Sequence, residues 1–230
     1  FSMKNKNQIH YKNLNMTLDG INGEIKAGNC NYVIESKLIG EFNAENILSA
    51  VAVAYSLGIR KEIIEKGIKL CSSIPGRMEI LIQSNGAKVI VDYAHTPDAY
   101  QKILSTIKSL SPIGSRLFLV FGAGGDRDKT KRSKMAQIAE TYSDYCFITP
   151  DNPRNENPKE ISNDIKKGFK RGNYFLFDDR EEGLKSALKK CNKNDIVIVL
   201  GKGREEYQEI ANEKIFYSDI AIIKENGMII

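Results

Sequence analysis

Short apolar runs alternate with amphipathic stretches along most of the chain. The apolar runs predict buried strands near 77–83, 88–92, 117–121, 145–149, 174–177 and 195–200. Between them, apolar residues recur at helical spacing and predict helices near 97–110, 130–142, 158–169 and 180–191. Short apolar strands separated by amphipathic helices are typical of a mainly parallel sheet with helices on both faces. The expected fold class is therefore α/β, with a Rossmann-like sheet.

The first seventy residues follow other patterns. Alternating polar and apolar residues before residue 40, interrupted by Asp19-Gly20 and Asn22-Gly23, predict a small antiparallel sheet with hairpin turns at these dipeptides. From Asn43 the spacing becomes helical as far as Gly58, and a second helix is expected over 63–71. The segment 72–76, which contains a proline, is the best candidate for a joint between two domains.

The composition predicts a protein that buries a core and stays in water. Its 230 residues are 41% hydrophobic, which suits one or two globular domains. The apolar runs are far shorter than the roughly 20 residues of a membrane span, and the opening residues lack the pattern of a secretory signal. Four widely separated cysteines are typical of reduced thiols. We expect a cytoplasmic location and no membrane partner.

The charge pattern does not favour binding to nucleic acid. The formal net charge is +5, and the lysines of 180–190 are interleaved with acidic residues, as on a solvated helix face. The cysteines and the two histidines lack the spacing of a structural zinc site. We therefore predict no nucleic-acid partner and no metal site built by this chain.

The first polar motif follows the predicted strand 88–92. Asp92 can accept hydrogen bonds from ribose hydroxyls, and His95 can donate one to a phosphate. Pro97 suits the first turn of the helix that follows. From spacing alone, an equally favoured interpretation is that Asp92 or Thr96 only caps this helix.

A glycine-rich segment, 121–129, follows the next predicted strand. Glycines let the backbone approach a ligand closely, and the N–H groups at a helix start favour anions. The segment matches neither a Walker A loop nor the dinucleotide fingerprint. Four cations beside the turn favour an anionic ligand: Arg127, Lys129, Lys131 and Arg132. The alternative is a tight turn before a solvated basic helix start, although cations are unfavourable at that end of the helix dipole.

Two further strand ends carry groups that suit an amino acid. In Asp151-Asn152-Pro153-Arg154 the proline would stiffen a turn that presents Asn152 and Arg154 to one place, and a guanidinium can bind a carboxylate through two hydrogen bonds. Taken alone, this tetrapeptide fits an ordinary Asn-Pro turn better. Gly201-Lys202-Gly203-Arg204-Glu205 adds accessible backbone and a carboxylate for an ammonium group, or else a helix start with well-placed acids.

These strand ends together offer groups for a carboxylate, an ammonium and phosphates. An amino acid that meets a phosphorylated partner fits this set. The sequence offers no serine or cysteine triad, and we assign no catalytic residue within the chain.

Six motifs occur in an order that resembles the Mur ligases, and the resemblance extends over about 38–219. They are Gly40-Glu41-Phe42-Asn43-Ala44-Glu45-Asn46, Gly76-Arg77-Met78-Glu79, Asp92-Tyr93-Ala94-His95-Thr96-Pro97, Gly124-Gly125-Asp126-Arg127-Asp128-Lys129, Asp151-Asn152-Pro153-Arg154 and Gly201-Lys202-Gly203.

The resemblance implies an ATP-dependent ligase of peptidoglycan biosynthesis. In this family ATP, with Mg²⁺, phosphorylates a carboxylate of a nucleotide-linked peptide, and the amine of the incoming amino acid then expels phosphate. The Asp-Asn-Pro-Arg motif resembles the branch that joins meso-2,6-diaminopimelate to UDP-N-acetylmuramoyl-L-alanyl-D-glutamate. It argues against the folylpolyglutamate and D-alanyl-D-alanine-adding branches. The expected partners are these small molecules, and a monomer is expected.

The resemblance also assigns residues to ligands. Asn46, Arg77, Asp92 and His95 would contact the nucleotide. Seven residues would hold the diamino acid: Arg127, Asp151, Asn152, Pro153, Arg154, Gly201 and Glu205. The position of Arg204 is usually histidine, which leaves open a close analogue such as lanthionine.

The domain plan of the family implies two parts for this chain. Residues 1–73 would be the end of the central ATP-binding domain, and residues 74–230 the C-terminal domain. The Gly-Thr-Asn-Gly-Lys-Thr loop of the family does not occur within residues 1–230, so we expect no ligase turnover from this chain alone. The alternative is a noncatalytic module that binds a nucleotide or an amino acid.

Overall fold

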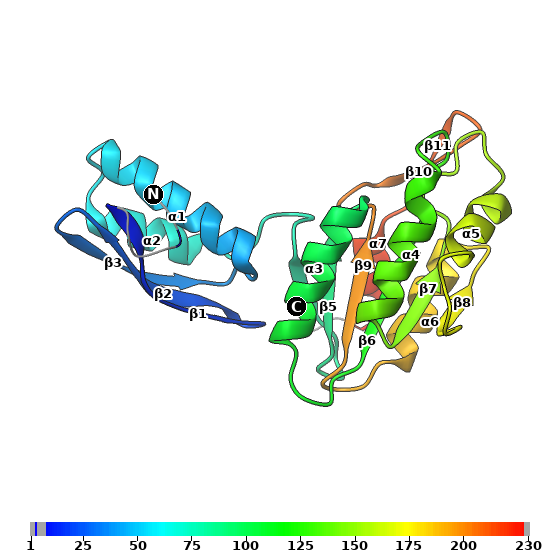
Figure 1. Cartoon of the computed structure of the whole chain (residues 1–230), viewed down its shortest axis with the longest axis horizontal. Coiled ribbons are helices and arrows are strands. Elements are labelled where there is room, and N and C mark those ends of the chain that lie inside the picture. Colours follow the sequence, from blue (N-terminus) through cyan, green and yellow to red (C-terminus); the bar gives the residue numbers. More distant parts are fainter. Residues whose placement is uncertain (1–2, 4–7, 228–230) are drawn as a thin grey trace. The chain divides into compact units, whose positions relative to one another are not determined.

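The computed structural model describes residue 3 and residues 8–227. The chain forms two compact units, and the division falls between Ile74 and Pro75. We describe each unit by itself (Figure 1). In the described part of the chain, the helices are too short or too polar to cross a membrane.

The first unit is an antiparallel sheet covered by two helices. The strands β1 (Ile9–Thr17), β2 (Gly20–Ala27) and β3 (Cys30–Ser36) pair in this order. Helices α1 (Glu41–Ser56) and α2 (Lys61–Leu70) follow. The core of this unit is formed by buried residues of the strands and of both helices, among them Ile21, Ile25, Ile34, Leu48 and Val51. The predicted antiparallel sheet and helix pair are confirmed.

One of the two predicted hairpin turns is wrong. Asp19-Gly20 does lie at the turn between β1 and β2. Gly23, however, pairs with Leu14 inside β2, and a Cβ atom there would lie 2.5 Å from the carbonyl oxygen of Asn13. The register of β1 shifts close to this point. Gly23 therefore serves a close approach of two strands, and the second turn lies beyond Ala27.

The second unit is built on a six-stranded sheet with the order β4-β5-β9-β6-β7-β8. Its strands are β4 (Glu79–Ile82), β5 (Lys88–Asp92), β6 (Leu117–Phe121), β7 (Tyr145–Ile148), β8 (Tyr174–Leu176) and β9 (Ile196–Leu200). The edge strand β4 is antiparallel to β5, and the other neighbours are parallel. The predicted, mainly parallel α/β sheet is confirmed.

Helices cover both faces of this sheet, as predicted. Helices α3 (Pro97–Leu110) and α4 (Thr130–Tyr142) lie on one face, and α6 (Arg180–Lys190) and α7 (Asp219–Glu225) lie on the other (Figure 1). Alternate strand residues such as Val89 and Val91 pack with Leu184 and Ile223 from the second pair of helices. The central strands β5, β6 and β9 are buried on both faces, which explains their continuous apolar sequences.

Short loops and capped helices follow the parallel strands. Helix α5 (Pro158–Lys166) begins after Asn157, whose side chain accepts a hydrogen bond from the backbone N–H of Lys159. Asp179 caps α6 in the same way by accepting from Glu182. In the sheet, Asp92 is level with Leu200, and Phe121 is level with Ile148. The loops that follow these four residues therefore meet at one edge.

A hairpin and a final helix are absent from the sequence-based prediction. The hairpin consists of β10 (Tyr207–Ile210) and β11 (Glu213–Phe216), and α7 comes directly after it. Its strands are short, half-buried or exposed, and rich in charge. Such a pattern gives no apolar run and no clear alternation, so only the tertiary contacts described below explain its position.

Candidate functional site

The carboxyl edge of the sheet contains a polar pocket of about 330 Å³. Seven of the predicted site residues line it: His95, Arg127, Asp151, Asn152, Arg154, Gly201 and Glu205. Tyr93, Gly124 and Lys131, which the prediction did not include among the site residues, line it too. His95, expected on the nucleotide side, thus shares one cavity with the residues expected to hold the amino acid.

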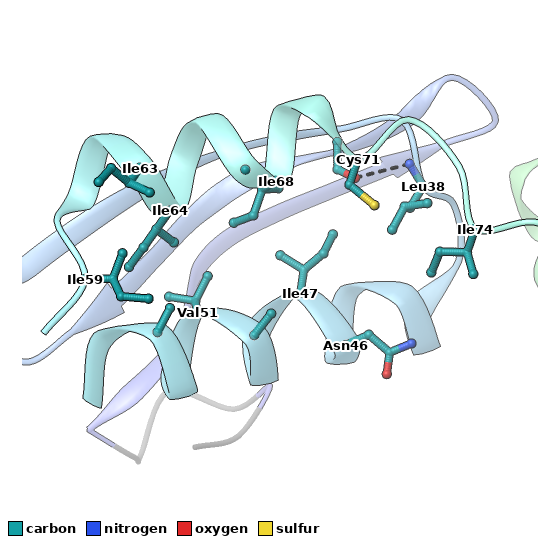
Figure 2. Close-up of a pocket in the computed structure, with 14 residues that line it drawn as sticks. Leu38, Asn46, Ile47, Val51, Ile59, Ile63, Ile64, Ile68, Cys71 and Ile74 are labelled. Atoms are coloured by element: carbon teal, nitrogen blue, oxygen red, sulfur yellow. Dashed lines mark hydrogen bonds between the residues drawn. The ribbon is translucent and has the colours of Figure 1, made fainter. Parts of the chain in front are cut away.

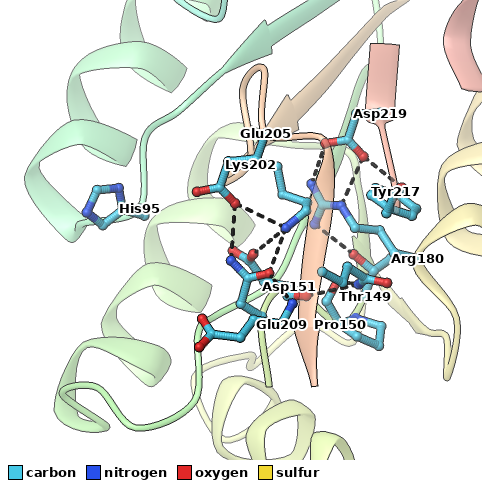
Figure 3. A network of polar contacts seen from close by, with 12 residues as sticks. His95, Thr149, Pro150, Asp151, Arg180, Lys202, Glu205, Glu209, Tyr217 and Asp219 are labelled. Carbon is cyan, nitrogen blue, oxygen red and sulfur yellow. Dashed lines mark hydrogen bonds and ion pairs between the residues drawn. The ribbon is translucent and has the colours of Figure 1, made fainter. Parts of the chain in front are cut away.

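Lys202 is a buried residue that binds three side chains of the pocket wall. Its side chain is fully buried, and its Nζ lies 2.9 Å from Asn152 Oδ1, 3.2 Å from Glu205 Oε2 and 3.4 Å from Asp151 Oδ1. Figure 3 shows these groups converging on the ammonium. A buried ammonium needs such partners because the protein interior solvates charge poorly. Lys202 therefore fixes two carboxylates and one carboxamide at the pocket wall.

The carboxamide of Asn152 makes three hydrogen bonds within the protein. Its Oδ1 accepts from Lys202 and from the backbone N–H of Glu209 at 3.0 Å, and its Nδ2 donates to Glu205 Oε2 at 3.1 Å. The carboxamide oxygen is therefore committed to the protein. One hydrogen of Nδ2 has no partner among the described contacts and remains for a ligand.

Arg154 also lines the pocket and has an unusual backbone conformation. Its φ angle is +51°, a region that is costly for a residue with a side chain. Its Nη1 donates to the carbonyl oxygen of Gly125 at 2.8 Å, and its Nε forms an ion pair with Glu209 Oε2 at 2.9 Å. The predicted turn therefore presents Asn152 and Arg154 to one cavity, while the residue that contacts both is Glu209.

The glycine-rich segment packs against this turn. A Cβ atom at Gly125 would lie 1.9 Å from the carbonyl oxygen of Pro153, and one at Gly122 would lie 2.2 Å from that of Thr149. These two glycines thus permit loop-to-loop packing, whereas a role in approach to a ligand was predicted for the segment. Pro153 is a buried residue of this turn and does not line the pocket.

Two of the four cations near this segment form ion pairs with acids of the same chain. Arg132 is fully buried and binds Glu156 and Asp164, each at 3.0 Å. Lys129 also pairs with Glu156, at 3.1 Å. Only Arg127 and Lys131 face the pocket. Burial lowers the pKa of the Lys131 ammonium, and this group donates to the carbonyl oxygen of His95 at 3.0 Å.

Glu156 gives the glycine-rich segment a testable pH dependence. Hydrogen bonds from Arg132 and Lys129 lower the pKa of Glu156 from 4.5 to about 2. Because the pKa is lower in the folded state, the stabilisation is complete above 4.5 and is lost as the pH falls toward about 2. We expect Glu156→Gln to flatten the fall in unfolding free energy across this window, measured by urea denaturation. An unchanged pH profile would contradict this role.

Asp92 holds the backbone near Arg77. It is only 3% exposed, and its two oxygens accept from the N–H groups of Met78 at 2.8 Å and Ala94 at 2.7 Å. Burial raises the pKa of the Asp92 carboxyl. Helix α3 is capped by Thr96, whose Oγ1 accepts from Ala99. Asp92 and Arg77 do not line the polar pocket, and the exposed Arg77 lies over the ring of Tyr93.

Arg204 points away from the pocket. Its guanidinium pairs with Glu79 through Nε at 2.8 Å and through Nη2. Glu79 also accepts from the N–H of Gly76 at 2.9 Å. Arg204 therefore ties the loop after β9 to the first residue of β4, and it does not line the pocket.

Asn46 lies in the first unit, beside a different cavity. This cavity is about 390 Å³ and lies between α1 and α2 (Figure 2). None of its fourteen described lining residues is charged; they include Ile47, Val51, Ile64 and Ile68. Such walls cannot orient a phosphate or a carboxylate, so the polar pocket is the better candidate for binding these groups.

The described residues do not form a group of three or more His, Cys, Asp or Glu side chains that could bind a metal ion. The acids of the pocket already bind Lys202 and Asn152. The pocket therefore has no fitting ligand set for the Mg²⁺ expected with ATP.

The chain belongs to the Mur ligases. The profile described as the glutamate ligase domain of Mur ligases matches residues 76–203, a range that contains the six-stranded sheet and every pocket residue except Glu205.

Curated relatives share the name UDP-N-acetylmuramoyl-L-alanyl-D-glutamate–2,6-diaminopimelate ligase. The relative from Fusobacterium nucleatum is 42% identical over 87% of this chain and 41% of its own length. The relative from Geobacillus kaustophilus is 36% identical over 99% of this chain and 47% of its own length. The chain thus spans less than half the length of these relatives.

Solved structures show the same relationship. A structure with the same ligase name matches 97% of this chain and 46% of its own chain, with a TM-score of 0.72 and 33% identity. A UDP-N-acetylmuramate-alanine ligase from Thermotoga maritima reaches a TM-score of 0.66 at 17% identity, which supports the fold alone.

Proposed function

We propose that this chain supplies the amino-acid site of a ligase that joins meso-2,6-diaminopimelate to UDP-N-acetylmuramoyl-L-alanyl-D-glutamate. The observation that carries the proposal is that the Arg154 guanidinium and the carboxylates of Glu205 and Asp151 line one pocket. A diamino diacid has ammonium and carboxylate groups at both ends. The pocket offers cationic and anionic side chains that match these groups.

Each polar group of the pocket has a role in this proposal. Arg154 binds the carboxylate that distinguishes diaminopimelate from lysine, and Arg127 binds the other carboxylate. Asp151 and Glu205 accept hydrogen bonds from an ammonium. Held in this way, the attacking amine is directed at the activated D-glutamyl carboxylate, and positioning of this kind lowers the barrier to bond formation.

The nucleotide side of the proposal rests on the family resemblance. Asn46, Arg77 and Asp92 would contact ATP, with His95 at the border between the two ligands. In the reaction, the terminal phosphoryl group of ATP goes to the D-glutamyl carboxylate, and phosphate leaves when the amine attacks the acyl carbon. The assignment of residues 1–73 to a central ATP-binding domain, the requirement for Mg²⁺, a monomeric state and a cytoplasmic location belong to the same proposal.

Replacement of Arg154 tests the substrate assignment. We expect Arg154→Ala to weaken binding of diaminopimelate by about 2–4 kcal/mol, because the second carboxylate loses its guanidinium partner. Binding of lysine, which lacks this carboxylate, should change little. Calorimetric titration of both ligands measures the difference.

The matched control is Arg171→Ala, since Arg171 is exposed and lies outside the pocket. An Arg154→Ala chain that binds diaminopimelate as tightly as the parent would contradict the proposed substrate. The second candidate function is a noncatalytic module that binds an amino acid, which the polar pocket by itself would also allow. ATP-dependent release of phosphate by the chain with both substrates would exclude it.

A further inference from the structure

The β10–β11 hairpin is hydrogen-bonded to the turn that contains Arg154. The N–H of Arg154 donates to the carbonyl oxygen of Glu209 at 2.9 Å, and the N–H of Ala211 donates to the carbonyl oxygen of Arg154 at 2.8 Å. These bonds form an isolated parallel bridge between Arg154 and Ile210. They hold Arg154 in its left-handed conformation, which a free turn would leave.

Glu209 also holds the side chain of Arg154. Its Oε2 lies 2.9 Å from Arg154 Nε, while the carbonyl oxygen of Gly125 takes one hydrogen of Nη1. Among the described contacts, Nη2 and the second hydrogen of Nη1 have no partner. The guanidinium therefore offers only its outer end to a ligand, because the Nε position is occupied.

The same residue fixes the neighbouring wall of the pocket. The backbone N–H of Glu209 donates to Asn152 Oδ1 at 3.0 Å, and this oxygen also accepts from Lys202. One residue of the hairpin thus sets the orientation of both Asn152 and Arg154. The side chains of Arg154 and Glu209 are both partly buried, so salt weakens their ion pair little.

We propose that Glu209 is a positioning residue that sets the preference of the pocket for a ligand with a second carboxylate. This inference rests on the proposed function and adds to it a residue outside the family motifs. Glu209 does not touch the ligand. By holding Nε, it keeps the outer N–H groups of Arg154 aimed into the pocket, and it neutralises the guanidinium when no ligand is bound.

The first test needs no ligand. NMR of the chain reports the exchange of the Arg154 Nε–Hε proton with water, assigned by its loss in Arg154→Lys. We expect slow exchange in the parent, where the Glu209 carboxylate lies 2.9 Å from Nε, and in Glu209→Gln, whose carboxamide oxygen can take the same place. Glu209→Ala should exchange at least about tenfold faster. The control is Glu213→Ala, because Glu213 is exposed on the adjacent strand. Equal exchange in parent and Glu209→Ala would overturn the inference.

The second test measures selectivity as the ratio of the Kd values for lysine and meso-diaminopimelate. We expect the ratio to fall at least about tenfold in Glu209→Ala and to persist in Glu209→Gln and Glu213→Ala. A preference that survives in Glu209→Ala would overturn the inference while leaving the proposed function intact. A parent chain without any preference would contradict the proposed function, and the selectivity role of Glu209 with it.

Discussion

Replacement of Lys202 by methionine is expected to lower the unfolding free energy by about 3–5 kcal/mol, because it removes one partner from a buried set of charges. Asp151 and Glu205 would then face each other without the ammonium that lies 3.4 Å and 3.2 Å from them. Methionine keeps most of the volume of lysine, so the loss reports the charge and its hydrogen bonds. Urea denaturation measures it.

The same variant should also lose binding of diaminopimelate, since Asn152 and Glu205 lose the group that orients them. Lys189→Met is the control: Lys189 is exposed on α6, and such a change typically alters stability by less than about 0.5 kcal/mol. If Lys202→Met matched this control in stability, Lys202 would not be the support of the pocket.

Asp219→Ala is expected to cost a similar amount, about 3–5 kcal/mol of unfolding free energy. Arg180 is fully buried, and its Nε and Nη2 bind the two oxygens of Asp219 at 3.0 Å and 2.9 Å. Without Asp219, this guanidinium keeps only Thr149 and the carbonyl oxygen of Leu200 as partners. Tyr217, which donates to Asp219 at 2.8 Å, loses its acceptor too (Figure 3).

Asp178→Ala provides the comparison, because the Asp178 side chain is 82% exposed and only pairs with Lys159 at 3.7 Å. Asp219→Asn should fall between the two, as it keeps the shape but removes the charge. A loss below about 1 kcal/mol in Asp219→Ala would show that Arg180 finds other partners, since a stranded buried charge costs more than that.

The fold of the second unit follows from its sequence because both faces of the sheet are buried. The strands around Val89, Leu119 and Ile198 are continuously apolar, and turns and amphipathic helices separate them. The β10–β11 hairpin was not predictable in this way. Its residues are partly exposed and polar, and it is placed by hydrogen bonds to Arg154, which lies more than fifty residues earlier in the chain.

The candidate site was predictable where a motif ends a strand. His95, Arg127, Arg154 and Gly201 follow different strands, yet they reach one pocket because the strands are parallel. The supporting residues carry no such signal. Lys202 was visible within its glycine motif, but its buried partners come from two loops, those after β7 and β9.

The sequence also could not show which cations near the glycine-rich segment pair with an acid of the same chain. Arg132 and Lys129 are as basic as Arg127 and Lys131, and spacing alone cannot tell which of them will meet Glu156. The acid that neutralises them lies in the next loop along the sheet edge. Counting the cations near the glycine turn therefore overestimates how many of them line the pocket.

The most direct test of the central claim is a ¹H–¹⁵N NMR titration of this chain with meso-diaminopimelate and, separately, with lysine. We predict that diaminopimelate binds more tightly and shifts the amide signals of Gly124, Asn152, Arg154 and Gly201, while amides of the first unit stay in place. Equal affinity for the two ligands, or shifts that avoid these residues, would contradict the assignment of this pocket to a diamino diacid.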